Sequence, residues 1–88
     1  MKFIEGIHIY KSKSGEIKIR QSKKYVWIIS KELEKENISP GDLVLVYCKN
    51  MKAPVIVLKV FESKEEKTKY KKVIKILDRV KRYKFNVT

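Results

Sequence analysis

The stretch from Tyr25 to Val46 constrains the fold of this chain most, because it predicts four structural units in a row. Tyr25–Ile29 is continuously apolar, which is typical of a strand covered on both faces. Ser30 can cap a short helix after it, and Pro40-Gly41-Asp42 has the residue types of a type II turn. An apolar strand then begins at Leu43. The sequence therefore predicts a strand, a short helix, a turn and a second strand at the centre of a mostly β domain.

Further strands are predicted on both sides of this central unit. An N-terminal strand over residues 3–11 and an alternating segment at Glu16–Gln21 can pair as a hairpin. The alternation predicts that Ile19 is buried while its charged neighbours point to solvent. Leu43–Tyr47 and Val55–Phe61 predict a second antiparallel hairpin, with a polar loop between them.

The chain changes character after Phe61. Ser63 and Glu66 have the spacing of a capping box, and strong helix formers follow them. These features predict an amphipathic C-terminal helix over residues 63–82. Four basic residues share one side of that helix: Lys71, Lys75, Arg79 and Arg82. The last residues also alternate between apolar and polar types, so a terminal strand remains an alternative.

The charge of the chain indicates its partner. The 88 residues carry a net charge of +12, which attracts nucleic acid or another anionic surface. A lysine-rich surface that only keeps the protein soluble would explain the same number. Residues 62–88 hold ten Lys or Arg and four Asp or Glu, so their net charge of +6 is half of the total. The Lys, Glu and Ile content is typical of proteins from hot environments and suggests an archaeal or viral source.

Size and composition predict a cytoplasmic homodimer. A core of 88 residues is marginal on its own, which favours dimerisation. The apolar runs are far shorter than the roughly 20 residues that cross a bilayer. Charged residues from Lys2 onward leave no signal-peptide pattern, and Cys48 as the one cysteine forms no intrachain disulfide.

Catalytic chemistry has little basis in the sequence. The chain has one histidine, His8, and one cysteine, Cys48, without a metal-ligand spacing, a phosphate-binding glycine loop or a nucleophile motif. We therefore expect no enzyme activity, no metal and no cofactor. Tyr25, Trp27 and Tyr47 could stack on bases as in single-strand binders, but core packing is the favoured role for these aromatic residues.

The central part of the chain resembles the AbrB/MazE/SpoVT swapped-hairpin family of small DNA-binding regulators and antitoxins. The run IKIRQSKKYVWIISKEL at residues 17–33 is similar to the basic strand, turn and strand-to-helix segment of that family. The run ISPGDLV at residues 38–44 is similar to its turn before a strand. Ser30 stands where the family usually has proline, and Lys23-Lys24 replace its small turn residues.

This resemblance implies a fold and a site. It implies an AbrB-like swapped-hairpin dimeric β-barrel over residues 1–61, with its core at residues 17–61 and an N-terminal strand at residues 3–11. Residues 62–88 would be a separate basic helix or tail. In the family, basic residues of the early strand and its turn bind nucleic acid. The matching positions are Lys18, Arg20, Lys23 and Lys24.

Together, these patterns predict a transcriptional regulator that binds double-stranded DNA as a homodimer. Its basic strand would contact phosphates, and the C-terminal helix would either extend the contact through its basic side or brace the dimer. Two alternatives remain open. One is an antitoxin-like module that holds a toxin protein through the apolar side of this helix. The other is a sequence-tolerant RNA-binding or chromatin-binding protein.

Overall fold

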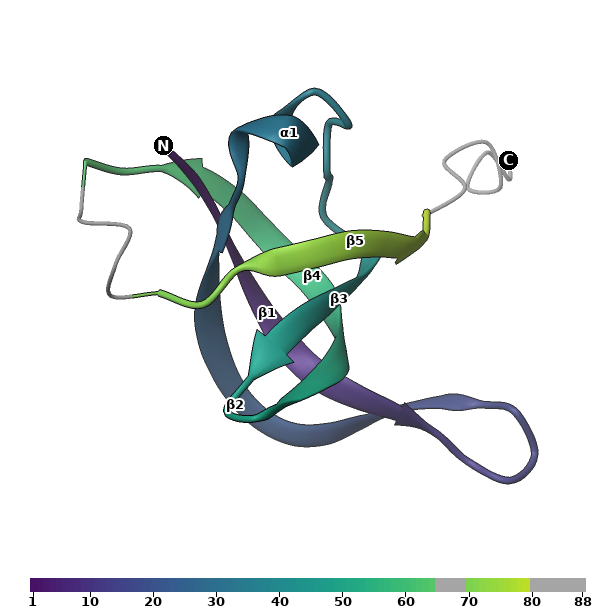
Figure 1. Cartoon of the computed structure of the whole chain (residues 1–88). Helices are drawn as coiled ribbons and strands as arrows, with labels where there is room; N and C mark the ends of the chain where they lie inside the picture. The colour runs from purple at the N-terminus through teal and green to yellow at the C-terminus, as the bar shows by residue number, and fades with distance from the viewer. Residues whose placement is uncertain (65–69, 80–88) are drawn as a thin grey trace.

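Five strands pair into one antiparallel sheet in the computed structural model, which describes residues 1–64 and 70–79 (Figure 1). The elements follow in this order: β1 (Lys2–Lys11), β2 (Ile17–Ile29), α1 (Lys31–Glu34), β3 (Leu43–Cys48), β4 (Met51–Glu62) and β5 (Val73–Asp78). The order across the sheet is β2-β1-β4-β3-β5. The two hairpins, β1–β2 and β3–β4, are therefore joined through the β1–β4 pair, and β5 is added at the outer side of β3.

The sheet curls until its two edge strands approach each other at one end of β5 (Figure 1). The Ile28 amide donates to the Lys71 carbonyl at 2.9 Å, and the Tyr47 amide donates to the Lys72 carbonyl at 3.1 Å. Ile28 and Lys72 form an isolated parallel bridge. In the described ranges, β2 and β5 share no strand ladder beyond this point, so the sheet is open.

The core lies inside the curl and receives side chains from every strand. Its buried members are Ile4, Trp27, Ile29, Ile38, Val44, Val46, Val55, Val57 and Val73. Val44 and Val46 face inward from β3, as the alternation of this segment predicts for one side of a strand. Full burial of each such side chain stabilises the fold by roughly 1.5–3 kcal/mol.

The order of elements in the central unit is as the sequence predicts, but α1 is only four residues long and Tyr25, in the strand expected to be covered on both faces, is 37% exposed. α1 begins after Ser30, whose carbonyl accepts from the Leu33 amide at 3.0 Å, although the Ser30 hydroxyl makes no capping bond. The turn after it has Gly41 at φ 95° and is closed by the Asp42 amide, which donates to the Ser39 carbonyl at 3.0 Å. This is the type II geometry that favours glycine. Among the described residues, no helix is long and apolar enough to span a membrane.

The prediction of an AbrB-like swapped-hairpin dimeric β-barrel is wrong. The β1–β2 hairpin pairs with β4 of its own chain, in a register that runs from Lys2–Glu62 to His8–Val55. β1 and β4 are ten and twelve residues long, and most of β1, from Lys2 to His8, pairs with β4. The β1–β2 hairpin therefore finds its partner within one chain, and the resulting sheet is open rather than a closed barrel.

The predicted C-terminal amphipathic helix is also wrong. The described residues 70–79 contain β5, which pairs with β3 through Val46–Val73 and Val44–Ile76. Val73, Ile74 and Ile76 are β-branched, and such residues favour a strand once a sheet edge is available to pair with. This tertiary pairing outweighs the helix propensity of the segment. The alternative of a terminal strand after residue 82 concerns residues outside the described ranges.

Candidate nucleic-acid interface

The end of the β1–β2 hairpin projects from the sheet as a two-stranded ribbon (Figure 1, lower right). We call residues 9–24 the basic arm. The pairing of β4 with β1 ends at His8–Val55, so the rest of β1 pairs only with β2. After a register shift between Ile7 and Ile9, the arm continues with the pairs Ile9–Ile19, Tyr10–Lys18 and Lys11–Ile17.

The tip of the basic arm has its own hydrogen bonds. The Gly15 amide donates to the Ser12 carbonyl at 2.9 Å, and the Ser12 amide donates to the Glu16 carbonyl at 2.9 Å. Gly15 has φ 88°, a conformation that glycine adopts without steric cost. The Ser12 hydroxyl also accepts from the Glu16 amide at 3.2 Å. The turn thus presents Lys13 to solvent on a defined backbone.

The basic arm concentrates positive charge. It contains six Lys or Arg and one acidic residue, Glu16, so its net charge is +5 of the total of +12. Lys13, Lys18, Lys23 and Lys24 have exposed side chains. Arg20 is described through its backbone, which lies in β2. Three of the four predicted early-strand residues, Lys18, Lys23 and Lys24, therefore have exposed side chains on β2.

Burial differs between the two strands of the basic arm. Ile9 of β1 is 5% exposed, whereas Ile19, its partner in β2, is 60% exposed, so the prediction that Ile19 is buried is wrong. Tyr10 in the facing strand is 44% exposed. An exposed ribbon of this kind leaves both charged and apolar side chains available to a partner.

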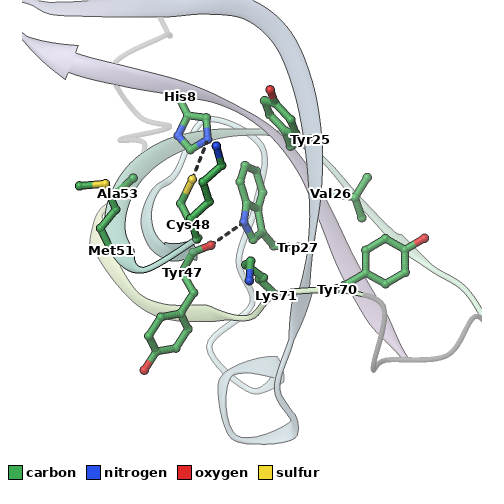
Figure 2. A pocket seen from close by; sticks show the side chains of 11 residues that line it. His8, Tyr25, Val26, Trp27, Tyr47, Cys48, Met51, Ala53, Tyr70 and Lys71 are labelled. Carbon is green, nitrogen blue, oxygen red and sulfur yellow. Dashed lines mark hydrogen bonds between the residues drawn. The ribbon is translucent and has the colours of Figure 1, made fainter.

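A groove of about 550 Å³ lies beside the base of the arm (Figure 2). We call it the aromatic groove, because five of the eleven described residues that line it carry rings: His8, Tyr25, Trp27, Tyr47 and Tyr70. The lining residues that the structure describes are mainly apolar, include Lys49 and Lys71, and contain no Asp or Glu. β1, β2, the β3–β4 hairpin and the segment before β5 all contribute to it.

Three rings at the upper end of the aromatic groove contact one another (Figure 2). The His8 ring centroid lies 5.5 Å from that of Tyr25 and 5.4 Å from that of Trp27, in edge-to-face arrangements. The Tyr25 and Trp27 centroids are 6.0 Å apart. Trp27 is 4% exposed, whereas Tyr25 is 37% exposed. Tyr25 is thus supported by two rings and remains accessible to solvent.

Core packing, the favoured role of the three aromatic residues, is confirmed for Trp27 alone. Its indole nitrogen donates to the Tyr47 carbonyl at 3.1 Å, which fixes the ring between β2 and β3. Tyr25 and Tyr47 are 37% and 45% exposed, so core packing is wrong for them. Cys48 is half-buried, and its sulfur lies 3.9 Å from His8 Nε2.

Lys23 connects the basic arm to the aromatic groove. Its ammonium lies 5.5 Å from the centroid of the Tyr25 ring, which is within range of a cation–π interaction. At an exposed site such an interaction contributes about 0.5–1 kcal/mol. Because this contact is weak, a ligand that offers Lys23 a phosphate can displace it.

The predicted basic stripe near the C-terminus does not form. Lys71 lines the aromatic groove, whereas Lys75 lies in β5 beside Leu45 of β3, with its side chain exposed. Lys71 precedes β5 and Arg79 follows it, and the register of β5 on β3 shifts twice, so the three residues do not continue as one regular row. Arg82 lies outside the described residues.

Arg79 has partners within the protein. Its guanidinium donates to the Asn37 carbonyl at 3.3 Å and to the Glu36 carbonyl. It also lies 3.6 Å from the Glu36 carboxylate and 3.8 Å from the Asp42 carboxylate. These contacts join the end of β5 to the segment after α1, which gives Arg79 a structural role.

Sequence reasoning found the basic arm but missed the aromatic groove. Part of the groove could have been found in the sequence of β2. Tyr25 and Trp27 are two residues apart, and residues at this spacing in a strand point to the same face. The contributions of His8, Cys48 and Lys71 depend on the sheet order and on β5, which the pattern did not reveal.

The fold and the site define a small antiparallel β protein with a basic arm beside an aromatic groove. Residues 1–79 match the model of a protein family described as a family of unknown function (DUF5839), and the chain belongs to this family. No curated protein and no solved structure matches the chain. The resemblance to the AbrB/MazE/SpoVT family gains no support from these comparisons.

Proposed function

We propose that this protein binds double-stranded DNA through the basic arm. The observation that carries the proposal is the net charge of +5 over residues 9–24, whose paired end projects from the sheet as a two-stranded ribbon. Lysines on such a ribbon can neutralise phosphates and release their counterions, which is the main source of affinity without sequence preference. The exposed side chains of Lys18, Lys23 and Lys24 are the expected contacts.

The shape of the basic arm favours duplex DNA over duplex RNA. Paired strands lie about 4.8 Å apart, and the major groove of B-form DNA, about 12 Å wide, admits a two-stranded ribbon. The major groove of A-form RNA is deep and narrow and excludes such an element. The shape of the arm therefore favours DNA over RNA as the nucleic acid that the protein binds.

Regulation of transcription, homodimerisation and a cytoplasmic location are parts of this proposal. They rest on the charge, the small size and the one cysteine of the chain. A toxin partner bound through a C-terminal helix is not proposed, because β5 occupies part of that segment.

Site-specific photo-crosslinking tests the proposal. A photoreactive residue replaces Lys13 at the tip of the arm in one variant and Lys35 after α1 in the other. Both lysine side chains are exposed, and each variant loses one positive charge, so the two variants have the same net charge. We expect crosslinks to duplex DNA from position 13 and background levels from position 35. A duplex RNA of the same sequence should compete poorly. Equal crosslinking at the two positions would contradict the proposal.

A further inference from the structure

The chemistry of the aromatic groove specifies what can occupy it. Among the described residues its lining is mainly apolar, with Lys49 and Lys71 as its charged members and no acidic one beside them. An occupant must therefore combine a flat apolar part with negative charge. At about 550 Å³, the groove falls within the range of small-molecule sites, about 300–1,000 Å³, so one nucleotide fits better than a stacked run.

Tyr25 offers the surface for the flat part. His8 and Trp27 support its ring at centroid distances of 5.5 and 6.0 Å, while 37% of the residue stays exposed. A supported and accessible ring loses little freedom when a base stacks on it. The Lys23 ammonium, 5.5 Å from the ring centroid, already places a cation where the phosphate of a stacked nucleotide would need one.

We propose that the aromatic groove binds an unpaired nucleotide of the DNA that the basic arm holds. The base stacks on Tyr25, and Lys23, Lys49 and Lys71 surround its phosphate. This inference rests on the proposed function, because the arm brings the DNA to the groove through Lys23, which lies in the arm and contacts the Tyr25 ring of the groove. The preferred ligand is then a duplex that continues into a single strand, rather than a continuous duplex.

Two DNA probes separate base stacking from phosphate charge. Both contain the same duplex with a single-stranded tail of equal length. One tail is made of thymidine nucleotides, and the other has the same sugar-phosphate backbone without bases. We expect the unmodified protein to bind the thymidine tail about tenfold more tightly in fluorescence anisotropy at equal salt, which is within the range for stacking of one base. Emission from Trp27, the one tryptophan, should also change with the thymidine tail alone.

Matched variants locate the effect. Tyr25→Leu removes the supported ring and should make the two tails bind equally. Tyr10→Leu is the control, because Tyr10 is 44% exposed on the arm but does not line the groove. It should keep the tenfold difference. Circular dichroism checks that both variants fold. If one does not, the comparison of the two tails with unmodified protein still tests the inference.

The outcomes distinguish the inference from the function beneath it. Equal affinity of unmodified protein for both tails, with duplex binding intact, overturns the groove inference and leaves the proposed function standing. Failure to bind either probe overturns both. If Tyr25→Leu instead dissociates a dimer in sedimentation, a second copy of the chain occupies the groove and the inference is overturned.

Discussion

The salt dependence of DNA binding is the most direct quantitative consequence of the basic arm. Its exposed side chains include Lys18, Lys23 and Lys24, all of which belong to β2. Each phosphate that a lysine neutralises contributes about 0.9 to the slope of log affinity against log salt for B-form DNA. Replacement of all three residues by glutamine should therefore reduce this slope by about 2.7.

This change is large enough to measure by fluorescence anisotropy with a labelled duplex. A slope difference of about 2.7 corresponds to a factor of about 40 when salt rises from about 50 to 200 mM. The unmodified protein should thus lose about 40-fold more affinity over this range than the triple variant. At the low-salt end the two proteins should differ most.

A control variant removes the same charge elsewhere. Lys31→Gln, Lys35→Gln and Lys64→Gln act on exposed lysines at the opposite end of the sheet, near α1 and the end of β4. Both triple variants lower the net charge from +12 to +9, since three positive charges are removed from each. Only the arm variant should change the slope. Equal slope changes in the two variants would refute the reasoning, because the total charge rather than the arm would then control binding.

Two predictions concern stability and are measured by urea denaturation. A Cβ at Gly6 would lie 2.8 Å from the Ile56 carbonyl oxygen, so Gly6→Ala should destabilise the protein by about 1–3 kcal/mol; an unchanged midpoint would contradict this. Asp42 is 1% exposed, accepts from the Ser39 amide at 2.9 Å and faces Arg79, so Asp42→Ala should cost about 1–3 kcal/mol. Asp42→Asn keeps an acceptor for Ser39 and should cost less, and equal losses would argue against this explanation.

The parts of the fold that depend on local chemistry could be predicted from the sequence. Pro40 and Gly41 determine the type II turn through their own backbone preferences, so no tertiary information is needed. The strand at Leu43 is equally visible, because its alternate residues Val44 and Val46 match the inward side of a sheet. The accessible lysines of the arm also follow from local alternation and charge.

Features that depend on distant pairing could not be predicted. Val73, Ile74 and Leu77 fit a helical spacing, and the choice of a strand depends on the free side of β3. The same limit explains the error over the swapped hairpin. Whether the hairpin pairs with β4 of its own chain or of another depends on tertiary contacts that two hairpin patterns do not contain.

The pairing of β5 with β3 also determines the candidate site. Lys71 and Tyr70 line the aromatic groove, and the Lys71 carbonyl is held by the Ile28 amide of β2 at 2.9 Å. β5 itself is held at its far end by Arg79, through its contacts with Glu36 and Asp42. One wall of the groove therefore depends on contacts at both ends of β5. Because the arm needs only β1 and β2, loss of these contacts should impair the groove while the arm keeps its charge and its affinity for duplex DNA.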